Sequence, residues 1–198
     1  IQLFQKELGY RYLGNWEKRE NNSNAEEDIL RKWLMKSGQW GVENADDPNS
    51  PLSILHYQLI DKAIYEFTKA VNDKSKSLYD VNKEVYSLLR YGVTVQPEIG
   101  QNKKTVWLID WKNPLANHFA IAEEVTIKGI HKKRPDIVLY VNGIALGVLE
   151  LKRSTVSISE GIRQNLDNQK HLFIKPFFST IQYVMAGNDI EGLAYGAI

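Results

Sequence analysis

Apolar side chains recur every three to four positions through much of the first half of the chain. A helix is predicted over 52–71, because apolar residues there fall on one face: Leu55, Leu59, Ala63, Phe67 and Val71. A second helix is expected over 78–90, ending before Gly92. We interpret this helix pair as a small insertion or lid on the core.

Weaker patterns precede the helix pair. A short helix is expected over 1–8 and an extended segment over 10–16. Asn24 is expected to cap a helix running to about Ser37, with acidic residues in its first turn. The polar, turn-rich stretch 41–51 is expected to be an exposed loop.

From Val93 the period of the apolar positions changes to two, which is typical of strands. Strands are expected at 93–95, 105–109, 119–127, 137–141, 144–151 and 181–186. Asn142-Gly143 joins two near-continuous apolar runs, which indicates a hairpin covered on both faces. Ser157 and Glu160 fit a capping box that opens a helix over 157–170.

This order of elements predicts an α/β fold in which helices flank a mixed β-sheet. We expect a single domain over 1–198, with a helical N-terminal part and insertion over about 1–92 and the main sheet and following helix over about 93–198. The chain begins with Ile1, and 193–198 resembles a strand still in progress. These ends suggest a fragment of a longer chain.

Composition narrows the class of protein. The chain has no cysteine, so disulfide frameworks and thiolate metal sites are excluded. It has no signal-peptide pattern and no apolar run of about 18 residues, which argues against a membrane span and for a cytoplasmic location. The four histidines show no paired spacing, so a zinc site is not expected.

Positive charge is local, although the net charge is only +1. His131-Lys132-Lys133-Arg134 stands just before Asp136, and Lys152-Arg153 forms a second cluster. A protein that binds a polyanion can be neutral overall when its cations are gathered in this way. Taken alone, the first cluster is equally well explained as a solvated loop end.

Two carboxylates, Asp136 and Glu150, border the apolar hairpin. A buried carboxylate needs a partner, and Mg²⁺ prefers carboxylate oxygens and satisfies both residues at once. Glu150 and Lys152 are two positions apart, so on a strand they share one face. The sequence therefore predicts a magnesium site with an ammonium group beside it, against the simpler interpretation of a surface ion pair.

The register of the hairpin decides whether Asp136 joins this site. A two-residue turn would pair Asp136 with Leu149 and turn it away from Glu150. A three-residue loop over 141–143, with a bulge at Gly143, would pair Asp136 with Val148 and put the carboxylates on one face. The hypothesis thus requires a bulged loop or another register shift.

Asp136 followed by Glu150-Leu151-Lys152 resembles the PD-(D/E)xK nuclease motif. The stretch from Arg134 to Lys152, RPDIVLYVNGIALGVLELK, is similar to the N-terminal nuclease region of the restriction (R) subunit of type I restriction-modification enzymes. The resemblance extends from about Glu26 to the end. It implies a restriction-endonuclease-like core in an ATP-dependent enzyme that cleaves unmodified foreign DNA.

The resemblance also implies roles for individual residues. Asp136 and Glu150 would hold Mg²⁺ with the backbone carbonyl of Leu151, and Lys152 would orient or help deprotonate the attacking water. The products would carry a 5′-phosphate and a 3′-hydroxyl. Gln164 on the following helix would match a Gln-x-x-x-Tyr motif.

Two further positions match the family less clearly. Asn168 stands where the motif has Tyr; it could contact DNA phosphate or orient Lys152 with Gln164, or lie on a solvated helix face. Glu27 resembles an acidic residue that such nucleases bring near the metal. Its other interpretation is compensation of the helix dipole.

The implied partners are double-stranded DNA and the methyltransferase and specificity subunits of a type I complex. Lys132, Lys133, Arg134 and Arg153 would contact backbone phosphates without reading sequence. ATP would be used by a motor beyond this chain, because neither G-x-x-x-x-G match here continues as a P-loop. Trp107, Trp111 and Phe119 are interpreted as core residues rather than stacking platforms.

Two alternatives remain at this point. The fold could serve only for binding or assembly, with the acidic pair kept for structure. The chain could instead be a stand-alone repair or recombination nuclease of the same fold.

Overall fold

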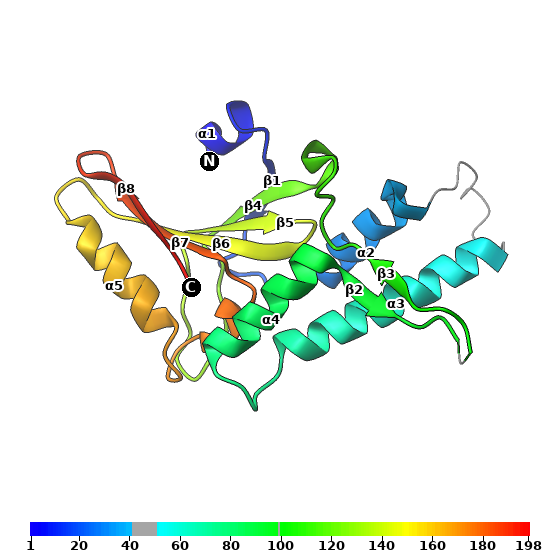
Figure 1. Cartoon of the computed structure of the whole chain (residues 1–198). Coiled ribbons are helices and arrows are strands. Elements are labelled where there is room, and N and C mark those ends of the chain that lie inside the picture. Colours follow the sequence, from blue (N-terminus) through cyan, green and yellow to red (C-terminus); the bar gives the residue numbers. More distant parts are fainter. Residues whose placement is uncertain (41–50, 99) are drawn as a thin grey trace.

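The computed structural model describes residues 1–40, 51–98 and 100–198 (Figure 1). The loop expected over 41–51 lies outside the described residues, except for its last position. The α-helices are α1 Gln2–Lys6, α2 Glu27–Lys36, α3 Pro51–Val71, α4 Leu78–Tyr91 and α5 Ile158–Asn168. Short 3₁₀ turns occur at η1 Gly38–Trp40, η2 Pro114–Ala116 and η3 Lys175–Ser179.

The strands are β1 Arg11–Asn15, β2 Val93–Val95, β3 Lys104–Val106, β4 Phe119–Glu123, β5 Ile137–Val141, β6 Ile144–Leu151, β7 Tyr183–Asn188 and β8 Gly192–Ala197. Six of them form one sheet in the order β1-β4-β5-β6-β7-β8. The pairs β1–β4 and β6–β7 are parallel and the other neighbours antiparallel, so the predicted mixed sheet is confirmed. The hairpin β2–β3 stands apart as a second, two-stranded sheet.

The helix pair α3–α4 is part of the packed body of the protein. Its apolar faces share one buried cluster with α2, the β2–β3 hairpin and Ile144 at the start of β6. The buried Asn82 of α4 donates to the carbonyls of Phe178, Ser179 and Ile181, which ties the helix to the segment before β7. Burial of an amide with its donors satisfied makes this a stable attachment.

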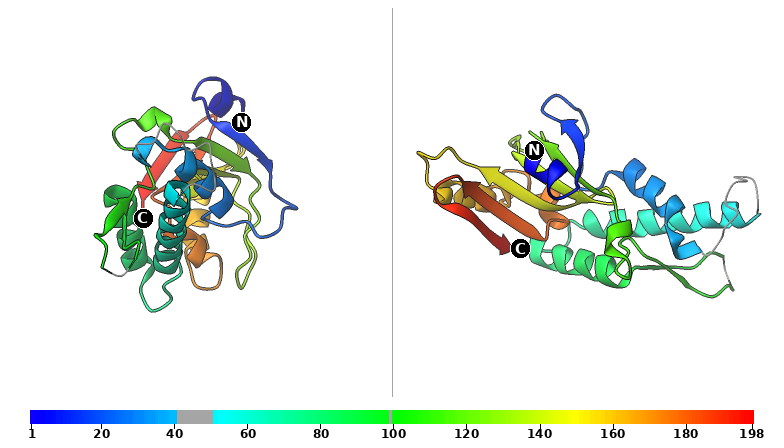
Figure 2. Two further views of the ribbon diagram at one scale, coloured as in Figure 1. Left: turned by 90° about the vertical axis from the view of Figure 1, so that its right-hand side faces the viewer. Right: turned by 90° about the horizontal axis from the view of Figure 1, so that it is seen from above.

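The molecule is elongated along one direction. Figure 1 shows α5 and β8 at one end and the β2–β3 hairpin with α3 at the other, and the view from above in Figure 2 shows the same separation. None of the described helices is long and apolar enough to cross a membrane.

The start of α2 differs from the prediction. The helix begins at Glu27, and Asn24 does not cap it. The Asn24 amide is buried and donates to the carbonyls of Pro176 and Phe177 and to Ser179. A long-range partner has therefore replaced the local capping bond that the sequence pattern favours.

The hairpin of β5 and β6 carries the register that matters for function. Asn142 and Gly143 form a two-residue turn with φ of 54° and 87°, so the expected three-residue loop is wrong. The register shifts further along, because Tyr140 pairs with Ala145 but Leu139 pairs with Gly147. The predicted need for another register shift is confirmed.

The shift leaves Leu146 as one extra residue in β6. Beyond it, Ile137 pairs with Leu149, and continuing by one residue places Asp136 beside Glu150. Val138 lies two positions after Asp136, and Val148 lies two positions before Glu150. Both valines belong to the core on one face of the sheet. Asp136 and Glu150 therefore share that face.

Gly143 also fixes where α2 docks. Its carbonyl accepts the N–H of Glu26 at 2.8 Å, and its φ lies in the left-handed region. A Cβ added there would stand 2.8 Å from the Glu26 carbonyl oxygen and 2.9 Å from Cβ of Ile29. Glycine is thus required by both the turn and the helix that rests on it.

Candidate active site

The candidate site lies where β5 begins, β6 ends and α5 passes over the sheet. The backbone N–H of Leu151 donates to Oδ2 of Asp136 at 2.6 Å, which holds the carboxylate against the end of β6. The side chain of Glu150 is fully buried, whereas that of Lys152 is 18% exposed. The structure therefore brings together the carboxylates and the cation that the sequence motif names.

Gln164 links the other two charged groups from α5. Its Nε2 donates to Oε2 of Glu150 at 2.7 Å, and its Oε1 accepts from Nζ of Lys152 at 2.7 Å. Nζ of Lys152 lies 3.9 Å from Oε2 of Glu150. The amide of Gln164 therefore bridges the ammonium of Lys152 and the carboxylate of Glu150 through two short hydrogen bonds.

Glu150 has an unusual environment for a carboxylate. Burial first, and then the negative charge of Asp136, raise its pKa to about 8 despite the opposing charge of Lys152. Its Oε1 has no hydrogen-bond partner among the described residues. Hydrogen bonding between the carboxyl groups of Glu150 and Asp136 also contributes to the raised pKa, so the protonated form of Glu150 has a partner that its ionised form lacks. In the ionised form, a buried oxygen without a donor is costly.

Close packing of α5 on the sheet depends on Gly161. A Cβ at this position would stand 2.9 Å from Cβ of Ala186 on β7 and 3.6 Å from Cβ of Glu150. Glycine therefore lets the helix approach closely enough for Gln164, one turn later, to reach the carboxylate. Ser157 caps the helix as predicted, by accepting the N–H of Ser159, while Glu160 pairs with Arg163 at 3.1 Å and Glu191 accepts the N–H of Ile158.

Asn168 does not lie on a solvated face. It is fully buried, and both polar atoms of its amide are without a hydrogen-bond partner in the described part of the chain. Its neighbour Asn165 donates to the carbonyl of Met185 on β7. Asn168 follows Gln164 by one helical turn but, being enclosed, does not reach a surface phosphate in this arrangement.

Glu27 is not brought to this cluster. It stands in the first turn of α2, where its Oε1 accepts from the hydroxyl of Thr68 on α3 at 3.2 Å. The start of α2 rests on Gly143, at the turn end of the hairpin, whereas Asp136 lies at its open end. Its position agrees with the helix-dipole interpretation.

The basic residues divide into two groups. Arg134 is held by two carboxylates, through Nη1 to Glu17 and through Nε to Glu124 at 2.7 Å. Lys133 lies over the ring of Phe173, at 4.1 Å from its centroid. Lys132 and Arg153 are exposed and form no ion pair with any described residue, so they alone of the four are free to meet a phosphate.

Glu124 is a residue of the site that the sequence reasoning missed. Its N–H donates to the carbonyl of Asp136 at 2.8 Å, and its charge contributes to raising the pKa of Glu150. Its φ of 51° is rare for a residue with a side chain. The only signal in the sequence is a carboxylate directly after an apolar strand.

No three His, Cys, Asp or Glu side chains in the described ranges form a metal-binding group.

Comparisons with known proteins show which family the chain resembles. A family model described as "Type I restriction enzyme R protein N terminus" matches residues 1–198. The chain is 26% identical over 130 residues to the type I restriction enzyme SauMSSORF170P endonuclease subunit of Staphylococcus aureus strain MSSA476, which covers 66% of this chain and 12% of that subunit. The chain therefore spans about an eighth of the length of that subunit.

Relatives occur beyond that genus. A putative type I restriction enzyme MjaVIIP endonuclease subunit of Methanocaldococcus jannaschii is 35% identical over 102 residues, covering 50% of this chain and 9% of that subunit. The type I restriction enzyme EcoprrI endonuclease subunit of Escherichia coli is 32% identical over 77 residues, covering 39% of this chain and 23% of the relative.

Proposed function

This chain belongs to the family of type I restriction enzyme R protein N termini, and from that premise we propose that it is a Mg²⁺-dependent endonuclease domain that hydrolyses DNA phosphodiester bonds. It would act as the cutting part of an ATP-dependent subunit. Its partners would be double-stranded DNA and the methyltransferase and specificity subunits of a type I complex.

The observation that carries the proposal is the unpartnered Oε1 of Glu150. This oxygen belongs to a fully buried side chain, and a second carboxylate, Asp136, stands beside it. Two adjacent carboxylates without enough donors fit a divalent cation. Mg²⁺ commonly keeps several of its waters and is held by one or two protein carboxylates, so Asp136 and Glu150 would suffice as side-chain ligands.

Asp136 and Glu150 would hold the ion, with the backbone carbonyl of Leu151 as a further ligand. When bound, Mg²⁺ supplies polarisation of the scissile phosphate and a lowered pKa of the attacking water. Hydrolysis forms a bond from the water oxygen to phosphorus and breaks the bond from phosphorus to the 3′ oxygen. The water loses a proton to solvent, and the departing oxygen gains one.

Lys152 has the geometry to assist both ends of this reaction. Its ammonium points to Gln164 and is only 3.9 Å from the Glu150 carboxylate, so a hydroxide or a phosphate oxygen near the acidic pair would meet its positive charge. A fixed cation at a developing negative charge stabilises the transition state. The hydrogen bond to Gln164 holds Nζ of Lys152 at 3.9 Å from Oε2 of Glu150, short of direct hydrogen bonding.

The test is cleavage of supercoiled plasmid by the assembled multisubunit enzyme with ATP and Mg²⁺. Lys152→Ala is expected to lower the cleavage rate by about a hundredfold or more, while DNA binding and ATP hydrolysis persist. Lys170→Ala is the matched control, because Lys170 is an exposed lysine just after α5 that pairs with Asp167 in the last turn of that helix. Cleavage by Lys152→Ala at the rate of the unaltered enzyme, or none by the unaltered enzyme, would contradict the proposal.

A further inference from the structure

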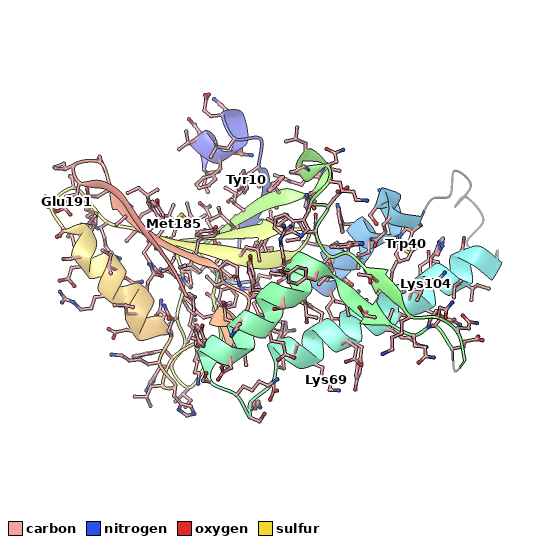
Figure 3. The ribbon with its side chains drawn as sticks, viewed as in Figure 1. Tyr10, Trp40, Lys69, Lys104, Met185 and Glu191 are labelled. Carbon is pink, nitrogen blue, oxygen red and sulfur yellow. The ribbon has the colours of Figure 1, made fainter. Side chains whose placement is uncertain are left out.

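A second site lies at the opposite end of the molecule from Glu150. Figure 3 shows Trp40 and Lys104 far from Met185 on β7 and from Glu191 in the turn between β7 and β8. Here an open cavity of about 840 Å³ lies between α2, η1, α3, α4, β3 and the segment that follows β3. We name it the aromatic cavity, because four indole side chains line it: Trp33, Trp40, Trp107 and Trp111.

The indole rings are fixed at their edges. The Nε1 groups of Trp33, Trp40 and Trp111 donate to the backbone carbonyls of Ala116, Leu34 and Leu89, at 3.1, 2.6 and 2.8 Å. One face of Trp40 is stacked on the ring of His56, with 4.8 Å between centroids, and the guanidinium of Arg90 lies over one face of Trp111 at 5.2 Å, so only the other face of each ring is left for a ligand. Fixed aromatic faces bind a planar partner with little loss of side-chain entropy.

Trp107 and Trp111 remain open to solvent. They are 40% and 44% exposed, so their interpretation as core residues was wrong. The backbone of Trp107 is held on both sides by the amide of Gln39, which accepts from its N–H and donates to its carbonyl. The exposed ring is therefore carried on a fixed backbone, as a binding platform requires.

The charge around the cavity is positive. Arg90, Lys104 and Lys112 line it against a single acidic residue, Asp110. None of these three cations forms an ion pair with a residue in the described ranges, and Arg90 makes a cation–π contact with the ring of Trp111, 5.2 Å from its centroid. Asp110 instead accepts backbone N–H groups of Lys112 and Asn113.

We propose that the aromatic cavity binds an unpaired nucleobase of single-stranded nucleic acid, stacked on Trp107 or Trp111, with the adjoining phosphate held by Lys104 and Arg90. Aromatic faces beside free cations are the combination that binds single strands without sequence preference. A duplex does not fit this chemistry, because its bases stack on each other. The proposal rests on the nuclease function only in taking nucleic acid as the ligand.

Photocrosslinking tests the proposal in the full R subunit. A short oligonucleotide carrying 5-iodouracil is irradiated with the protein, and the attached peptide is identified by mass spectrometry. The expected product joins the iodouracil base to Trp107 or Trp111, with single-stranded but not with double-stranded probe. Because the readout is a position, strands bound elsewhere in the subunit do not obscure it.

Variants make the result decisive. Trp107→Leu and Trp111→Leu together are expected to lower the crosslink yield at least about fivefold, the effect of losing one stacked base. Tyr195→Leu, at an exposed aromatic on β8, is the matched control and should change nothing. If the double variant fails to fold, Lys104→Glu at the rim is expected to lower the yield in its place.

Three results would overturn the inference: no crosslink at either tryptophan, equal yield with duplex probe, or displacement of the oligonucleotide by an equal concentration of dTMP. The last would assign the cavity to a free nucleotide. Lys152→Ala separates this inference from the nuclease proposal, since it should abolish cleavage and leave the crosslink unchanged.

Discussion

Gln164 donates its amide N–H to the buried Oε2 of Glu150 at 2.7 Å. Its carbonyl oxygen accepts from Lys152 on the other side, and this fixes which end of the amide faces which charge. This position needs a side chain that both donates and accepts a hydrogen bond. A side chain of similar size that lacks either function should therefore disturb Lys152 or Glu150.

Gln164→Met is expected to lower the cleavage rate of the assembled enzyme by about tenfold to a hundredfold, because Lys152 loses its acceptor and Glu150 its donor. Gln164→Glu should be at least as damaging, since a carboxylate accepts from Lys152 but repels Glu150. The measurement is the single-turnover cleavage rate at saturating DNA. Rates equal to that of the unaltered enzyme in both variants would contradict a positioning role.

The raised pKa of Glu150 predicts how stability depends on pH without metal. In the unfolded chain the carboxyl ionises near its ordinary value of 4.5, whereas in the folded chain its pKa is about 8. Between these values only the unfolded state loses its proton, so stability falls as pH rises, by up to about 1.4 kcal/mol per pH unit. Below 4.5 the contribution is constant, and above 8 the loss is complete.

Glu150→Gln removes this titration. Hydrogen exchange of the peptide 144–152, corrected for the intrinsic pH dependence of exchange, should show weakening protection from pH 5 to 8 in the unaltered protein and a flatter profile in the variant. Metal chelator is present throughout. Identical profiles would show that Glu150 is already ionised in the folded state.

Gly161→Ala tests the close approach of α5 to the sheet. The added methyl would stand 2.9 Å from Cβ of Ala186, and overpacking of this kind costs about 1–3 kcal/mol. Alanine regains up to about 1 kcal/mol of helix propensity, so a net loss of stability and a slower cleavage rate are expected. The double variant Gly161→Ala, Ala186→Gly should recover both, and failure to recover would show that the contact is not limiting.

Lys132 and Arg153, which form no ion pair with a described residue, are expected to affect DNA binding differently from the paired Arg134. Arg153→Ala and Lys132→Ala should each weaken DNA binding and reduce its dependence on salt by about one phosphate contact. Arg134→Ala should leave the salt dependence unchanged and loosen the segment 124–136, because Arg134 holds Glu17 and Glu124 together. The binding constant measured across a salt series separates the two outcomes.

The hairpin strands could be predicted with unusual accuracy from the sequence. Both predicted ranges, 137–141 and 144–151, match β5 and β6 residue for residue, because β-branched runs and an Asn-Gly turn are local signals. The capped start of α5 at Ser157 was equally local.

What escaped prediction depends on contacts between distant segments. The bulge at Leu146 has no local signature, and the position of Glu124 beside Asp136 follows from the pairing of β4 with β5. The local pattern favours Asn24 as a helix cap, since the carbonyls that bind it lie about 150 residues further along the chain. Apolar character alone does not report exposure, and so it does not distinguish Trp107 and Trp111 from core residues.

The extra residue Leu146 affects how the sequences of related domains are to be compared. An in-frame deletion of one codon between Leu146 and Glu150 would remove the bulge and restore regular pairing, and Glu150 would still lie opposite Asp136 on the same face of the sheet. A deletion of one codon in β5 between Asp136 and Tyr140 would instead place Asp136 opposite Leu149 and turn the two carboxylates to different faces, with every letter of the motif kept. Copies of this domain are therefore to be compared by the number of residues on each strand of the hairpin, as well as by the identity of the motif residues.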